Sequence, residues 1–171
     1  NPGVRDQFQS LGRHAAFQEL LRRLDQERSG RSQIGGLTPT AKALYLTLLW
    51  QHLEQPVLII TDTNRTAEIL VELIQTFFDL LLSGQGAPPP ILIPALDVLP
   101  GQSLAPHTEL KEQRAVGLYR LASGKCSIVV TPVAGALLRT EDANAYRQLA
   151  LTLRTNDEIA MDDLAAHLES I

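Results

Sequence analysis

The residues of this chain with the clearest chemical potential lie in one short stretch, residues 36–43. Their spacing follows the frame G-x-x-x-x-G-K-[ST], which binds nucleotide phosphates. In that frame the glycines let backbone N–H groups approach the phosphates, the lysine adds positive charge, and the Ser or Thr hydroxyl holds Mg²⁺. Gly36 stands at the first glycine position and Lys42 at the lysine position. The stretch therefore keeps the frame of a phosphate-binding loop.

Three residues in this frame lack the features that bind phosphate or Mg²⁺. The second glycine is replaced by Ala41, whose methyl group stands where a phosphate would approach. Pro39 has no N–H to donate, and Ala43 has no hydroxyl for Mg²⁺. We predict a vestigial phosphate loop with no functional cofactor and no catalytic residue, formed by Gly36, Thr38, Thr40, Ala41, Lys42 and Ala43. On the pattern alone, an ordinary strand–loop–helix connection with a chance lysine fits equally well.

Other polar side chains give weaker signals. The four histidines are too far apart for a metal-binding spacing, so no metal site is predicted: His14, His52, His107 and His167. The acidic pairs at 141–142 and 162–163 are interpreted as solvated charges rather than catalytic carboxylates. Five arginines make the first 31 residues locally basic, which indicates a solvated helix face or, alternatively, a contact with phosphate or an acidic partner: Arg13, Arg22, Arg23, Arg28 and Arg31.

Composition is typical of a globular protein that works outside the membrane. The 171 residues carry a net charge of −4, which argues against a nucleic-acid binder with a basic surface. No apolar run approaches the ~18–20 residues of a membrane span, and no signal peptide is visible. Cys126 cannot form an internal disulfide, and its apolar neighbours indicate a buried, reduced thiol. These features predict a cytoplasmic protein. Asn1 stands where a start Met would, which indicates an excised piece.

Apolar spacing predicts alternating helices and strands. Strands are expected over 32–36, 56–61, 91–95, 126–131 and 149–153, and helices over 14–27, 40–53, 64–82, 108–121, 132–139 and 161–170. The near-continuous apolar run at 56–61 predicts a parallel strand covered on both faces. Thr108 is the expected cap of its helix. The helix over 64–82 is expected to turn these residues inward: Ile69, Leu70, Leu73, Phe77 and Leu80–Leu82.

This alternation predicts an α/β fold, a parallel sheet with helices on both faces. Ligands of such sheets bind beyond the carboxyl ends of the strands. The loop at 36–43 is expected at that edge, together with residues 61–64 and residues 131 and 132.

Four segments together resemble the first, UvrB-like domain of the bacterial transcription-repair coupling factor family. They are residues 34–49 with the degenerate loop, 56–78 with a strand, turn and helix, 92–121, and 126–140. The third segment is the most specific, since a strand leads into A-x-D-x-L-P, then S-x-x-P, then a helix that carries Arg114. Arg114 is expected to be engaged in packing or in an ion pair with Glu109 or Glu112.

The resemblance implies a domain division. Residues 1–31 would be an N-terminal helical segment, residues 32–148 the degenerate helicase-like domain, and residues 149–171 the start of an inserted second domain. UvrB carries an aromatic hairpin that engages damaged DNA where this chain has only residues 96–107, which contain no Tyr or Phe. The acidic helicase motif for Mg²⁺ is also missing. The resemblance thus implies a degenerate RecA-like, superfamily 2 helicase-like scaffold that neither hydrolyses ATP nor grips DNA damage.

The resemblance also implies partners and a role. The module would contribute to the recruitment of UvrA in nucleotide excision repair, mainly through the inserted domain. RNA polymerase and DNA would be bound by other parts of a parent protein, an ATP-dependent DNA translocase, and no membrane is involved. Two alternatives stay open: the nucleotide-binding half of a superfamily 2 helicase that still uses Lys42, and a flavodoxin-like ligand-binding domain.

Overall fold

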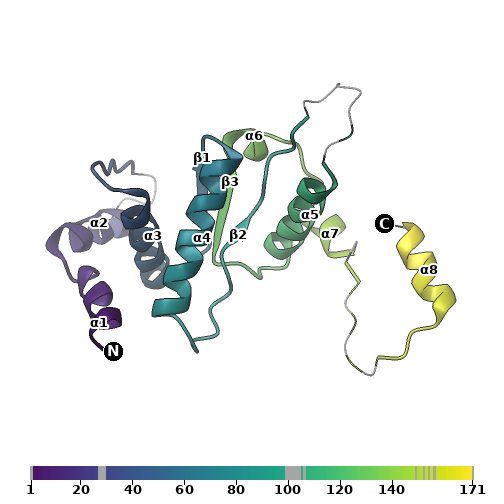
Figure 1. Cartoon of the computed structure of the whole chain (residues 1–171), viewed down its shortest axis with the longest axis horizontal. Helices are drawn as coiled ribbons and strands as arrows, with labels where there is room; N and C mark the ends of the chain where they lie inside the picture. The colour runs from purple at the N-terminus through teal and green to yellow at the C-terminus, as the bar shows by residue number, and fades with distance from the viewer. Residues whose placement is uncertain are drawn as a thin grey trace.

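The computed structural model describes residues 2–26, 30–98, 105, 107–148, 150, 151, 153, 155 and 157–170. Its centre is a three-stranded parallel sheet in the order β1-β3-β2, formed by β1 (Val57–Thr61), β3 (Ile128–Pro132) and β2 (Ile91–Leu92). The helices are α1 (Pro2–Leu11), α2 (Ala15–Gln26), α3 (Pro39–Leu53), α4 (Asn64–Leu81), α5 (Thr108–Ala122), α6 (Val133–Ala136), α7 (Ala143–Gln148) and α8 (Met161–Ser170) (Figure 1). The predicted α/β class is confirmed.

Helices cover both faces of the sheet, as predicted. On one face α3 and α4 bury a core with the sheet residues Leu92, Ile128 and Val130. On the other face, the α5 residue Leu118 packs against a smaller cluster of Ile91, Ile93, Cys126 and Val129. Burial raises the pKa of the Cys126 thiol, so the prediction of a buried free thiol is confirmed.

The expectation that the strand at 56–61 is covered on both faces is wrong. In β1, Leu58 is 61% exposed and Ile60 is 56% exposed, and the three residues between and beside them are half-buried. The exposure follows from the position of β1 at the edge of the sheet, since α5 packs over β2 instead. The central strand β3 has the expected environment, with all five residues buried.

The strand predicted at 32–36 is also absent. Residues 30–37 run as irregular chain without a backbone hydrogen bond to any element among the described residues. Ile34 is 51% exposed, and Gly36 adopts a φ of +77°, which glycine tolerates best. These five residues, Ser-Gln-Ile-Gly-Gly, have one large apolar side chain and two glycines, and no described strand lies beside them to pair with. The sequence also predicts a strand at 149–153. Residues 150, 151 and 153, which the structure describes, lie outside any strand.

The inward face of α4 and the cap of α5 differ from the expectations based on the sequence. Ile69 was expected to face inward in α4 but is 45% exposed, while Ala67, Ile74 and Phe78 are buried. The cap of α5 is the residue before Thr108, His107, and it makes no side-chain capping bond. Its backbone N–H instead donates to the carboxylate of Asp97 at 3.0 Å. The intervening residues 99–104 and 106 lie outside the described residues.

The two N-terminal helices dock on the helical layer. In α1, Phe8 meets Phe77 edge-on at 5.5 Å, and the Arg5 guanidinium donates to the Leu81 carbonyl at 2.7 Å. In α2, Phe17 is buried and meets Tyr45 edge-on at 5.3 Å. Arg22 and Arg23 both pair with Glu19 on the exposed face of α2 and lower the pKa of that carboxyl to about 2.

The C-terminal part extends away from the sheet. In Figure 1, α8 stands apart from the layers formed by the other helices. No helix among the described residues combines the length and apolar character needed to cross a membrane.

A close approach between α5 and β2 predicts that Gly117→Ala destabilises the fold. A Cβ at Gly117 would lie 2.9 Å from the Leu92 carbonyl oxygen and 2.9 Å from Cγ1 of Ile93. We expect a net loss of about 1–2 kcal/mol of unfolding free energy, because the overlap outweighs the better helix propensity of alanine. Gly3→Ala in α1 is the matched control, since a Cβ there meets nothing within 4 Å. Urea unfolding of both variants measures the difference; equal stabilities would contradict the close packing of α5 on β2.

Candidate functional site

The degenerate loop leads into the N-terminal turn of α3, where Thr38 engages two of its N–H donors. Thr38 is the N-cap, and its Oγ1 accepts from the Ala41 N–H at 3.3 Å. The Lys42 N–H donates to the Thr38 carbonyl at 2.9 Å. Pro39, the first residue of the helix, has no N–H.

Ala43 lies where the Mg²⁺-binding hydroxyl of an intact loop would stand. It is fully buried in the core between the helices and the sheet. Its carbonyl accepts a hydrogen bond from the buried Thr47 hydroxyl at 2.9 Å, one turn further along α3. This position is therefore part of the packing of α3, and no metal ligand is offered from it.

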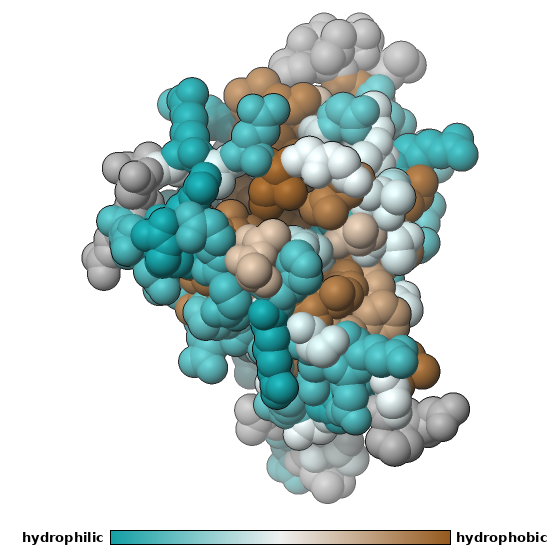
Figure 2. All heavy atoms as spheres, turned by 90° about the vertical axis from the view of Figure 1, so that its left-hand side faces the viewer, coloured by the Kyte–Doolittle hydropathy of each residue, from teal (hydrophilic) through white to brown (hydrophobic). Residues whose placement is uncertain are grey.

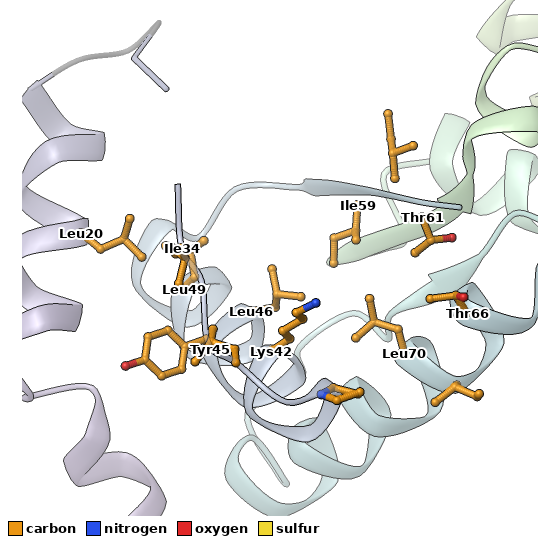
Figure 3. A pocket seen from close by; sticks show the side chains of 14 residues that line it. Leu20, Ile34, Lys42, Tyr45, Leu46, Leu49, Ile59, Thr61, Thr66 and Leu70 are labelled. Carbon is orange, nitrogen blue, oxygen red and sulfur yellow. The ribbon is translucent and has the colours of Figure 1, made fainter. Parts of the chain in front are cut away.

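Lys42 is the charged residue of the loop. It is exposed and reaches from α3 into a cleft of about 580 Å³ between α3, α4 and β1 (Figure 3). Ile59, Ile60 and Thr61 line the cleft from β1. The remaining lining residues are mostly apolar, from α2, the segment before α3, α3 and α4: Leu20, Ile34, Leu37, Pro39, Tyr45, Leu46, Leu49, Thr66, Ile69 and Leu70.

The electrostatics of this site disfavour a polyanion. Lys42 supplies one positive charge to the cleft. Asp62, the residue that follows Thr61, holds a negative charge close by in the sequence. Hydrogen bonds from the Thr66 side chain and the Thr63 backbone lower the pKa of Asp62 below its ordinary value, so this carboxylate stays ionised at neutral pH. A largely apolar cleft with one lysine offers too little positive charge for a nucleoside triphosphate.

The structure brings together two of the three segments expected at the carboxyl edge of the sheet. Thr61 lines the same cleft as Lys42. Thr131 and Pro132, by contrast, are buried and lead directly into α6, where Gly135 packs on the Thr131 hydroxyl. The third segment therefore contributes to packing and not to the cleft.

Two polar side chains hold the chain after β2. The amide of Asn64, the first residue of α4, donates to the Ala95 carbonyl at 3.0 Å and accepts from the Ala95 N–H at 2.9 Å. The Arg114 guanidinium donates to the Pro94 carbonyl at 2.9 Å and is buried. Burial lowers the pKa of Arg114, which nonetheless stays a cation. The predicted packing role of Arg114 is confirmed, with a carbonyl as its partner.

Comparison with known proteins finds a distantly similar protein. No family model matches the chain. Over 137 residues, 80% of the chain, it is 23% identical to the transcription-repair-coupling factor of Haemophilus influenzae. The chain spans 11% of the length of that relative. The match supports a distant relation to transcription-repair coupling factors, in agreement with the family that the sequence resembles.

Proposed function

We propose that the chain is a non-catalytic, UvrB-like module of a transcription-repair coupling factor that contributes to the recruitment of UvrA. The observation that carries the proposal is the state of the phosphate loop. The first turn of α3 is capped by Thr38 and begins with Pro39, and its hydroxyl position is the buried Ala43. The distant relation to the coupling factor of Haemophilus influenzae supports the choice of family.

The fold is proposed to be a degenerate helicase-like domain with the boundaries predicted above. In this proposal ATP hydrolysis and DNA translocation belong to other parts of the parent protein, as does the contact with RNA polymerase. The frame of the phosphate loop then persists because it begins α3, which supplies Ala43, Leu44 and Leu48 to the core. In this proposal the loop sequence is retained for its role in packing α3, although it no longer binds phosphate.

One observation favours a second candidate, a small-molecule-binding domain. The cleft beside Lys42 has the volume and apolar lining of many ligand sites. Its occupant would be largely uncharged, for the electrostatic reasons given above. A screen for thermal shifts with apolar ligands would detect such binding.

The proposed function predicts that UvrA binds a longer polypeptide much more tightly than it binds these 171 residues. A stable interface needs ~800 Å² per partner, centred on aromatic or arginine anchors. Residues 36–43 offer neither anchor type. We expect a polypeptide extended through the next domain to bind immobilised UvrA at least about 100-fold more tightly, about 2.7 kcal/mol. Interferometry on both polypeptides measures this ratio.

The control for that comparison is Leu137→Lys in the longer polypeptide. Leu137 is 80% exposed and lies after α6, outside the predicted inserted domain. Its replacement should leave UvrA binding unchanged. Equal and tight binding by the 171-residue chain would place the contact surface on this domain and contradict the assignment.

A further inference from the structure

A groove lies along β2, at the edge of the sheet opposite β1. It encloses about 690 Å³ between α4 and α5, and the buried residues Ile91 and Leu92 of β2 form its base. Figure 1 shows β2 between these two helices. The side that carries the N-terminal helices is a different surface, on which apolar side chains reach solvent between hydrophilic ones (Figure 2). This β2 groove shares no lining residue with the cleft beside Lys42.

The outer edge of β2 is closed to a further strand. The Ile93 N–H donates to a carbonyl of β3 at 2.9 Å, so this residue directs its backbone toward β3. Because backbone direction alternates along a strand, the outward positions are Pro90, Leu92 and Pro94. The two prolines have no N–H to donate, and the Pro94 carbonyl already accepts from Arg114 at 2.9 Å. An occupant of the β2 groove must therefore bind through side chains.

Carboxylates on both walls give the β2 groove a negative charge. Glu72 lines it from α4, and Glu109 and Glu112 line it from α5. All three side chains are exposed, and Arg120 is the cation among the described residues that line the groove. None of the three carboxylates forms an ion pair within the part of the chain that the structure describes. The groove therefore repels phosphates, nucleic acids and anionic lipids and attracts a cationic partner.

Apolar side chains lie beside these carboxylates. Val116 is 49% exposed and stands one turn after Glu112 on the same face of α5. On the opposite wall, the half-buried Val71 of α4 also lines the groove. The α5 wall is held close to β2, since a Cβ at Gly117 would lie 2.9 Å from the Leu92 carbonyl oxygen. An apolar base with charged walls is the counterpart of an amphipathic helix, which buries its apolar stripe and keeps its charges at the sides.

The helices that the structure describes do not supply this occupant. The α2 helix is basic, but Arg22 and Arg23 pair with Glu19, and the buried Phe17 holds α2 against α3. The C-terminal helix α8 carries two aspartates in its first turn, so the carboxylates of the β2 groove would repel it. The complementary helix is therefore assigned to a partner protein.

We propose that the β2 groove is a docking site for a basic amphipathic helix of a partner protein. The apolar stripe of that helix packs on Val71 and Val116, and its lysines and arginines lie beside Glu72, Glu109 and Glu112. Charge and apolar contact act together, so neither alone gives the full affinity. This docking goes beyond the proposed function and does not depend on UvrA.

NMR titration of the isotope-labelled 171-residue chain tests the docking site. The probe is a stapled helical peptide of about 15 residues, with one stripe of leucines flanked by lysines. We expect a dissociation constant below about 100 µM, with the largest shifts at the amides of Val71 and Val116. A second stapled peptide of the same composition, with its leucines spread around the helix, should bind at least about tenfold more weakly. Binding weaker than about 1 mM by the first peptide, or equal binding by both, would overturn the proposal.

Charge reversal on each wall separates the groove from a general attraction to an acidic protein. Glu72→Lys on α4 and Glu112→Lys on α5 should each weaken binding of the first peptide at least about fivefold. Asp25→Lys makes the same charge change at an exposed residue of α2 and should weaken binding less than about twofold. Val116→Asn, which removes apolar contact without a change of charge, should weaken binding at least about threefold. If Asp25→Lys had the same effect as the two groove variants, the proposal would be wrong.

Two further outcomes would identify a different occupant and overturn the assignment to a partner protein. Shifts of the Val71 and Val116 amides that grow with protein concentration, without peptide, would mean that a second copy of the chain docks there. Loss of peptide binding in a polypeptide extended beyond residue 171 would mean that the same polypeptide fills the groove. Retained peptide binding in the extended polypeptide would support a separate partner.

Discussion

Arg114→Ala should cost about 3 kcal/mol of unfolding free energy. Arg114 is 8% exposed, and its guanidinium donates to the Pro94 carbonyl at 2.9 Å. Truncation removes a hydrogen bond from a charged donor, worth ~1.5–3 kcal/mol, and the packing of the side-chain stem. It also leaves the buried Pro94 carbonyl without its partner. Chemical denaturation of the purified variant measures the loss.

Two control variants separate the causes of this loss. Arg114→Met keeps the stem and removes the donor, so we expect an intermediate cost of about 2 kcal/mol. Arg120→Ala changes an exposed arginine of the same helix and should shift stability by less than ~0.5 kcal/mol. If Arg114→Ala were as mild as Arg120→Ala, the hydrogen bond to Pro94 would not contribute to the fold.

Sequence patterns succeeded where one element determines its own environment. The helical spacing over 40–53 and the cap and periodicity over 64–82 predicted α3 and α4 to within a few residues. The apolar run at 126–131 predicted β3, whose central place in the sheet gives it two paired edges. Local propensity and burial agree in these elements, so the pattern alone was sufficient.

The failures lie where an element depends on a distant neighbour. The run at 56–61 has the composition of a fully covered strand, yet β1 is an edge strand with Leu58 and Ile60 exposed. Residues 32–36 were expected to form a short strand before α3, but they have no strand beside them among the described residues. A local sequence pattern indicates the environment that a segment prefers. It does not indicate which other segment will lie beside it. Both errors fall on the two sides of one cleft.

The sequence predicted the phosphate-loop residues of the candidate site but not the apolar cleft beside them. The spacing placed Gly36 and Lys42 at the start of a helix, as the structure has them. No sequence signal gave the apolar cleft, because its lining comes from α2, α3, α4 and β1. The roles of Asn64 and Arg114 in holding Pro94 and Ala95 likewise depend on contacts across 20 to 31 residues.

Loss of nucleotide binding is the second large effect that we expect. A working phosphate loop with a micromolar dissociation constant gains ~8 kcal/mol on binding, whereas a millimolar constant corresponds to ~4 kcal/mol. In this chain Pro39 donates nothing, the Ala41 N–H already bonds to Thr38, and the buried Ala43 offers no hydroxyl to Mg²⁺. Binding of Mg-ATP should therefore be at least about 1,000-fold weaker than in an intact loop.

Two variants complement the measurement of Mg-ATP binding. Lys42→Ala should change little, because there is almost no binding to lose. Restoration of the motif by Pro39→Gly, Ala41→Gly and Ala43→Thr should still give no ATP turnover. The chain has no acidic motif that would position Mg²⁺ and water, and the added threonine would enter the core at the buried Ala43. Turnover by the triple variant would mean that such an acidic partner is present.

Isothermal titration of Mg-ATP into the 171-residue chain tests most directly the central claim that the phosphate loop is vestigial. The account predicts no binding tighter than about 1 mM, with at most a weak and unspecific attraction of anions to the first turn of α3. A dissociation constant in the micromolar range, lost in Lys42→Ala, would show a working nucleotide site and contradict the claim.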